Sequence, residues 1–237
     1  MTELPVKGQG EAYLLNPSKI IALGLNYQDH ASEDIMQKIA GSQKTAPAEP
    51  ILFAMTPNVL IGPGEEIVIP AFLDDYNFDD LRIDYEGELA LVIKDRCRNL
   101  DPEAVYDHIL GFTCFNDVTC RNIQNSDVSG WFRGKSFDTF GPVGPEIVPL
   151  SEVGDPDSLD IRTRVNGEIV QESNTSHMIF SVKELVAYIS RQFTLEAGDF
   201  ITTGTPSGVG KLNPGDIVEI EIERIGSLVN GVRKERG

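Results

Sequence analysis

The sequence predicts a mixed α+β fold that is rich in β-strand and carries a few helices outside its sheets. Short apolar runs of strand length recur from residue 51 onward. Turn signals such as Asn166-Gly167 and Pro214-Gly215-Asp216 separate several of these runs. The runs do not alternate regularly with helical segments, so antiparallel or mixed sheets fit better than a repeated βαβ unit.

The expected strands begin with Lys19–Leu25, an apolar run that indicates a buried strand. The others are Ile51–Ala54, Ile67–Ile69, Glu88–Ile93, Gly111–Asn116, Asp160–Val165, Phe200–Thr203 and Ile217–Ile222. Asn166-Gly167 predicts a tight type I′ hairpin that joins Arg162–Val165 to Glu168–Val170, because both turn positions need a positive φ.

Helices are expected at Asp29–Ala40, Pro102–Ile109 and Ser181–Phe193. The first is weakly apolar and is followed by a loop over residues 41–47. We therefore expect a mobile flap over about residues 27–47, with a surface helix and its linker as the alternative. In the last helix, Ser181 and Glu184 have the spacing of a capping box.

Length and composition favour one large domain over residues 1–237. The chain has 41% apolar residues and a net charge of −17. This charge argues against nucleic acid or an anionic membrane as a partner, because both attract basic surfaces. No apolar run approaches the length of a membrane span. A small anionic substrate remains compatible, because a local cation overrides the global field.

The cysteines and the N-terminus indicate a cytoplasmic protein. Cys97, Cys114 and Cys120 are odd in number and show no CxxC spacing, which argues against a disulfide framework. The first residues lack the charged and apolar regions of a signal peptide.

Two glutamates, Glu86 and Glu88, stand where the apolar run up to Ile93 begins. Side chains at i and i+2 of a strand point to one face, so the two carboxylates are expected side by side. At about 5 Å and an effective dielectric constant of about 20, their repulsion is about 3 kcal/mol. Burial adds several kcal/mol for each ion. A divalent cation would offset both, because hard cations take carboxylate oxygens.

Asp117 follows the apolar strand Gly111–Asn116, where its carboxylate is placed to point into a cleft. With Glu86 and Glu88 it would supply three oxygen ligands. This set suits Mg²⁺ or Mn²⁺, with Ca²⁺ as a further option, and does not suit zinc, which prefers histidine and cysteine. For each acid alone, the alternative is a surface carboxylate or a salt bridge.

His30 and Glu33 lie three residues apart in the helix-like flap segment and so share a helical face. A glutamate that accepts a hydrogen bond from an imidazole fixes its tautomer and raises its basicity, as a general base requires. The alternative is a surface ion pair.

Six segments together resemble the fumarylacetoacetate hydrolase family, in its order and at its spacing, from about Lys19 to Asn230. They are GLNYQDH (24–30), DYEGELA (84–90), NDVTCRNIQ (116–124), RGKSFD (133–138), VNGE (165–168) and TTGTPSGVG (202–210). None is decisive alone, whereas the set is specific.

The resemblance implies a β-sandwich roll with a few peripheral helices, assembled as a homodimer. It also implies a divalent metal, Mg²⁺ or Mn²⁺, as cofactor. The implied ligands of this metal are Glu86, Glu88 and Asp117.

Catalytic and substrate-binding roles are implied as well. His30 and Glu33 match the pair that activates water, and Lys135 reaches the region of the metal-bound substrate. Three positions match residues that line the pocket or hold the substrate carboxylate, namely Arg121, Gln124 and Thr205.

The implied reaction is hydrolysis of a C–C bond in a 2-oxo acid of the acylpyruvate or fumarylpyruvate type, through a metal-stabilised enolate. The family also contains oxaloacetate-type decarboxylases and isomerases of unsaturated 2-oxo diacids, and the resemblance does not choose among them. Outside enzymes, the alternative is a binding module for a metal or keto acid, which would have no need of the His30–Glu33 pair. The chain departs at Asn122, where the family commonly has aspartate. This difference bears on metal affinity and catalytic rate and not on metal binding itself, and the sequence does not give the size of the effect.

Overall fold

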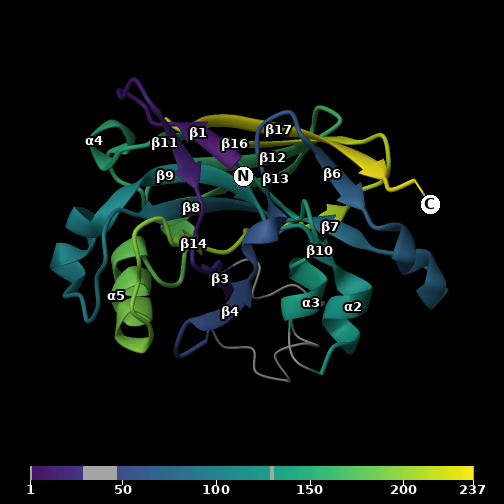
Figure 1. Ribbon diagram of the computed structural model, residues 1–237, viewed down its shortest axis with the longest axis horizontal. Helices are drawn as coiled ribbons and strands as arrows, with labels where there is room; N and C mark the ends of the chain where they lie inside the picture. The colour runs from purple at the N-terminus through teal and green to yellow at the C-terminus, as the bar shows by residue number, and fades with distance from the viewer. Residues whose placement is uncertain (1, 29–46, 129–130, 237) are drawn as a thin grey trace.

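A seven-stranded mixed sheet forms the centre of the fold (Figure 1). The computed structural model describes residues 2–28, 47–128 and 131–236. In spatial order the strands of this sheet are β4 (Ile51–Met55), β3 (Ile20–Gly24), β14 (Phe200–Thr202), β8 (Gly87–Ile93), β9 (Ile109–Asn116), β11 (Gly141–Val148) and β5 (Leu60–Ile61). Residues 29–46 of the flap predicted over about residues 27–47 lie outside the described residues, together with His30 and Glu33.

A second, five-stranded sheet packs on the first (Figure 1). Its strands in spatial order are β13 (Glu168–Asn174), β12 (Asp160–Val165), β16 (Ile217–Ile222), β17 (Gly226–Lys234) and β6 (Glu66–Ile69). Two small sheets complete the β structure, one of β10 (Thr119–Cys120), β7 (Ile83–Tyr85) and β15 (Gly210–Lys211), the other of β1 (Thr2–Pro5) and β2 (Ala12–Leu15).

The helices lie around the sheets (Figure 1). The α-helices of the described residues are α2 (Arg121–Ser126), α3 (Phe132–Lys135), α4 (Leu150–Val153) and α5 (Val182–Gln192). The 3₁₀ helices are η2 (Pro57–Val59), η3 (Ala71–Tyr76), η4 (Pro102–His108) and η5 (Thr175–His177). Across the part of the chain described, no helix is both long and apolar enough to cross a membrane.

The predicted fold class is confirmed, and each strand expected from the sequence is present. Asn166 and Gly167 have φ values of 53° and 84°, as the predicted hairpin turn requires. Ser181 and Glu184 form the capping box that begins α5. The helix expected at Pro102–Ile109 is present as a 3₁₀ helix over Pro102–His108, and Ile109 instead begins β9.

Strand β8 is buried along its whole length and separates two hydrophobic clusters. Leu89 and Leu91 belong to the larger cluster, which includes side chains of the five-stranded sheet. Ala90 and Val92 belong to the smaller cluster on the opposite face of the strand. Glu88 has the same parity as Ala90, so its side chain lies on the face away from the five-stranded sheet.

Candidate metal centre

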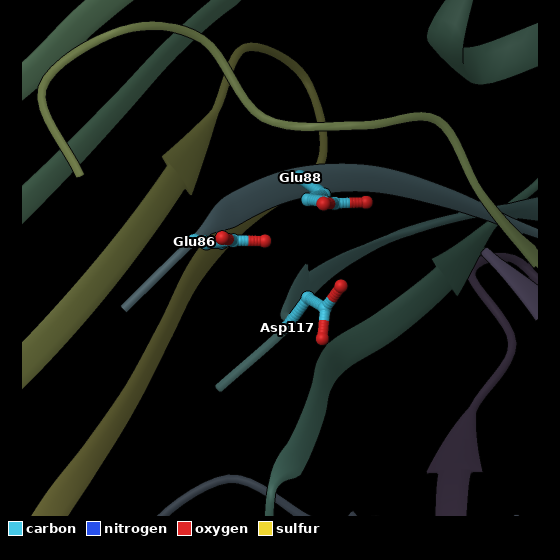
Figure 2. A group of neighbouring side chains, drawn as sticks. All are labelled: Glu86, Glu88 and Asp117. Atoms are coloured by element: carbon cyan, nitrogen blue, oxygen red, sulfur yellow. The ribbon is translucent and has the colours of Figure 1, made fainter. Parts of the chain in front are cut away.

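The three predicted metal ligands lie together where β8 begins and β9 ends. Glu86 joins β7 to β8, Glu88 lies in β8, and Asp117 directly follows β9. One carboxylate oxygen from each lies within 4.8 Å of the others, and all three residues are buried. Figure 2 shows Glu86 and Glu88 projecting in the same direction, with Asp117 beside them. The i, i+2 argument from the sequence therefore gave the correct geometry for the pair.

Backbone hydrogen bonds hold the three ligands in place. The Glu86 amide donates to Asn116 Oδ1 at 3.0 Å, and the Asp117 amide donates to the Glu86 carbonyl at 2.9 Å. The Gly204 amide donates to Glu88 Oε2 at 2.9 Å, which orients that carboxylate from the loop after β14. The ligand positions are thus fixed by groups of the protein itself.

Two oxygens of this cluster are buried without a hydrogen-bond partner among the described residues, Glu88 Oε1 and Asp117 Oδ1. Burial raises the pKa of Glu88 well above its usual range, and the charges of Asp117 and Glu86 add to the rise. Burial also raises the pKa of Asp117 to about 6, although Lys135 acts in the opposite direction. A hard divalent cation would satisfy both oxygens and reduce the repulsion, so the residues present fit Mg²⁺ or Mn²⁺.

Lys135 reaches this cluster from α3, a single turn that packs closely on α2. A β-carbon at Gly134 would lie 2.8 Å from Gln124 N, so only glycine permits this approach. The Lys135 ammonium donates to Glu86 Oε2 at 2.8 Å, to Asp117 Oδ2 at 2.6 Å and to Thr119 Oγ1 at 2.8 Å. Burial alone would lower the pKa of Lys135, but the charges of Asp117 and Glu86 outweigh it and raise the pKa.

Arg121 connects the cluster to Asp84, a residue that the sequence reasoning missed. Its Nε donates to Asp84 Oδ2 at 2.8 Å, its Nη1 to Gln124 Oε1 at 2.9 Å, and its Nη2 to Glu86 Oε1. Arg82 Nε also donates to Asp84 Oδ1 at 2.9 Å. The same i, i+2 alternation, continued from Glu86 toward the N-terminus, would have placed Asp84 on the same face as Glu86 and Glu88.

The charges of the centre favour an anionic ligand once a divalent cation is bound. The carboxylates joined in it belong to Asp84, Glu86, Glu88 and Asp117, and the cationic side chains to Arg82, Arg121 and Lys135. When fully ionised these described groups carry one excess negative charge. A divalent cation reverses that sign, so an anionic substrate would be attracted.

The predicted substrate residues Arg121, Gln124 and Thr205 line one pocket together with Glu86 and Lys135. Its apolar wall is formed by Leu23, Gly24, Leu25, Phe53 and Trp131. The Gln124 amide nitrogen has no hydrogen-bond partner among the described residues, so it is available to an acceptor. The Thr205 hydroxyl donates to the Gly87 carbonyl at 2.9 Å, so contact with a substrate carboxylate would require that bond to break.

Asn122 lies at the edge of the centre, outside the metal-ligand cluster. Its Oδ1 accepts from the Arg82 amide at 2.8 Å, and its Nδ2 donates to the Asp80 carbonyl at 2.9 Å. An aspartate could make the first bond but not the second. Asn122 is linked to the metal ligands indirectly, through Arg82 and Asp84 and through its neighbour Arg121, which donates to Glu86. An effect of Asn122 on metal affinity stays a prediction.

Replacing Lys135 with methionine is expected to destabilise the metal-free protein by about 3–5 kcal/mol, because it leaves buried carboxylates without their counter-charge. Mn²⁺ should restore part of the loss. Urea unfolding with and without Mn²⁺ measures both effects. Lys183→Met is the control, since its pair with exposed Glu103 is worth about 0–1 kcal/mol. Equal losses in the two variants would contradict the role of the buried ammonium.

Comparison with known proteins identifies relatives over nearly the whole chain. The model of the family described as "Fumarylacetoacetate (FAA) hydrolase C-terminal" matches residues 19–233. Oxaloacetate tautomerase YisK of Bacillus subtilis is 42% identical over 224 residues, which span 91% of this chain and 70% of that protein.

Two solved structures share the fold. The 2-hydroxyhepta-2,4-diene-1,7-dioate isomerase from Mycobacterium marinum has a TM-score of 0.79 at 37% identity, over 96% of this chain and 82% of that one. Fumarylpyruvate hydrolase from Pseudomonas aeruginosa, solved in complex with Mn²⁺ and pyruvate, has a TM-score of 0.84 at 28% identity. The match covers 99% of this chain and 96% of that one.

Proposed function

Because this chain belongs to the fumarylacetoacetate hydrolase family, we propose that it is a divalent-metal-dependent enzyme that forms the enol or enolate of a 2-oxo acid. The observation that carries the proposal is the pair of buried, unpartnered oxygens on Glu88 and Asp117 beside Glu86. A cation held by these residues would act as a Lewis acid toward the oxygens of the substrate.

The other side chains of the pocket supply binding and charge stabilisation. The Gln124 amide is available to donate a hydrogen bond to a carboxylate of the substrate, beside Arg121. The Lys135 ammonium is a fixed positive charge that stabilises a developing oxyanion without reorganisation. The aromatic rings of Phe53 and Trp131, with centroids 5.3 Å apart, form an apolar wall that limits water in the pocket.

The first candidate reaction is enol–keto conversion of a 2-oxo diacid. The relatives that support it are the Bacillus subtilis oxaloacetate tautomerase and the Mycobacterium marinum isomerase, at 42% and 37% identity. This reaction moves a proton between carbon and oxygen and needs no attacking water. Decarboxylation of a diacid of the oxaloacetate type would instead break a C–C bond by loss of CO₂ and leave the enolate of the shortened 2-oxo acid, which then takes up a proton.

Hydrolysis of an acylpyruvate or fumarylpyruvate is the second candidate, supported by the Pseudomonas aeruginosa hydrolase. In this reaction His30, oriented by Glu33, would remove a proton from water. The hydroxide would then attack the distal carbonyl. The C–C bond would break with its electron pair on the 2-oxo acid, which would leave as an enolate and take up a proton. We also propose that the protein forms a homodimer and lies in the cytoplasm.

A substrate panel tests this function directly. The purified chain is incubated with Mn²⁺ or with EDTA and with oxaloacetate, an acylpyruvate or fumarylpyruvate. We expect the ultraviolet enol band of at least one substrate to decay faster with Mn²⁺ than with EDTA. Pyruvate release separates cleavage or decarboxylation from tautomerisation. No metal-dependent change with any of the three would contradict the proposal.

A further inference from the structure

Gln171 is a buried amide of β13 whose hydrogen-bonding capacity is fully used. Its Oε1 accepts from the Gly87 amide at 3.1 Å and from Thr163 Oγ1 at 2.7 Å. Its Nε2 donates to Thr205 Oγ1 and to the Pro206 carbonyl, both at 2.9 Å. One side chain of the five-stranded sheet thus contacts both the strand that carries the metal ligands and the loop after β14.

These contacts act on Gly87, the residue between the two glutamates. Its N–H donates to Gln171, and its carbonyl accepts from the Thr205 hydroxyl at 2.9 Å. A β-carbon at Gly87 would lie 2.2 Å from Thr163 Oγ1, so the two sheets approach each other here as closely as glycine allows. Gly87 is therefore held through both its N–H and its carbonyl, while its side-chain position faces the five-stranded sheet, opposite to the side chains of Glu86 and Glu88.

The backbone of β13 is irregular next to this amide. Thr163 pairs with Gln171 and Arg164 pairs with Ile169, so Val170 is an extra residue in the ladder with β12. A bulge of this kind re-aims the neighbouring side chains and is frequent beside active sites. The irregular pairing places Gln171 where it can reach both Gly87 and Thr205.

We propose that Gln171 is a positioning residue for the metal centre, which together with Thr205 fixes the spacing of the Glu86 and Glu88 carboxylates. The inference rests on the proposed function, because it takes these carboxylates as ligands. The same inference gives Thr205 a role besides lining the pocket. Its hydroxyl hydrogen is directed to Gly87, so Thr205 acts on the ligand strand as well as lining the pocket.

Gln171→Met tests this role, since methionine has a similar length but makes none of the four hydrogen bonds. We expect the affinity for Mn²⁺, titrated by electron paramagnetic resonance, to fall by about 10–100-fold, the usual effect of removing a partner that orients a ligand. Thr205→Val should weaken Mn²⁺ binding in the same way, and Thr205→Ser should preserve it. The double variant should lose less than the product of the two single effects, because both act through Gly87.

Asn230→Leu is the matched control. Asn230 is also a buried amide of the five-stranded sheet, and it donates to the Gly62 and Glu65 carbonyls, away from the metal ligands. This variant should keep its Mn²⁺ affinity even if its melting temperature falls. Wild-type affinity in folded Gln171→Met would overturn the proposal. If Gln171→Met does not fold, unchanged affinity in Thr205→Val would overturn it.

Hydrogen exchange provides a readout that needs no metal. In Gln171→Met, peptides that contain Gly87 should exchange faster than in the wild type and in Asn230→Leu, because the Gly87 amide loses its acceptor. Unchanged exchange would overturn the proposal. Failure of the wild-type protein to bind Mn²⁺ would overturn the proposed function instead, and the exchange at Gly87 would then decide the structural role of Gln171 by itself.

Discussion

Glu88→Gln is expected to abolish Mn²⁺ binding and metal-dependent turnover without destabilising the metal-free protein. The glutamine oxygen can still accept from the Gly204 amide, and the new NH₂ group replaces Glu88 Oε1, which has no partner among the described residues. Burial, and after it the negative charges of Asp117 and Glu86, raise the pKa of Glu88, so a negative charge on this side chain is unfavourable here. The substitution removes that charge. It therefore relieves repulsion while it removes a ligand.

Urea unfolding with and without Mn²⁺ separates these two effects. At a metal concentration 100 times its dissociation constant, the wild-type protein should gain about 2.7 kcal/mol, and Glu88→Gln should gain nothing. Glu172→Gln is the control, because Glu172 is exposed and pairs only with Arg162 among the described residues. Retained Mn²⁺ stabilisation in Glu88→Gln would exclude Glu88 as a ligand. Lower stability without metal would contradict the electrostatic argument.

Local patterns were sufficient to predict most strands and the spacing of the two glutamates. Period-2 alternation determines which side chains share a face, so Glu86 and Glu88 could be placed side by side before any tertiary contact was known. The Asn166-Gly167 turn and the Ser181 capping box are likewise decided by a few neighbouring residues. Position along one element is therefore readable from the sequence.

What the sequence did not reveal depends on contacts between distant segments. Strand β11 contains Gly141, Pro142, Gly144 and Pro145, which disfavour a strand by propensity, yet it pairs with β9 and β5. Gln171 is 84 residues from Gly87, and nothing in its local pattern marks it as a partner of the metal ligands. Asp84 was within reach of the alternation argument, but its link to Arg121 needed the packing of α2.

His30→Ala is expected to lower C–C hydrolysis by about 10²–10⁴-fold, the usual contribution of a general base. Mn²⁺ affinity should be unchanged, because the proposed ligands are all other residues. Enol–keto conversion, which requires no attack by water, should persist. The measurements are pyruvate release from an acylpyruvate, decay of the oxaloacetate enol band, and an Mn²⁺ titration on the same preparation.

The control for this substitution is His177→Ala, since His177 ends the 3₁₀ helix η5 and its Nδ1 contacts Ser173 Oγ away from the pocket. Glu33→Gln should slow hydrolysis less than His30→Ala, because a neutral amide can still accept from the imidazole but no longer raises its basicity. Full hydrolysis in His30→Ala would refute the role of the pair. Loss of enol–keto conversion together with hydrolysis would instead make His30 a proton carrier common to both reactions, so the two assays together decide which chemistry the pair serves.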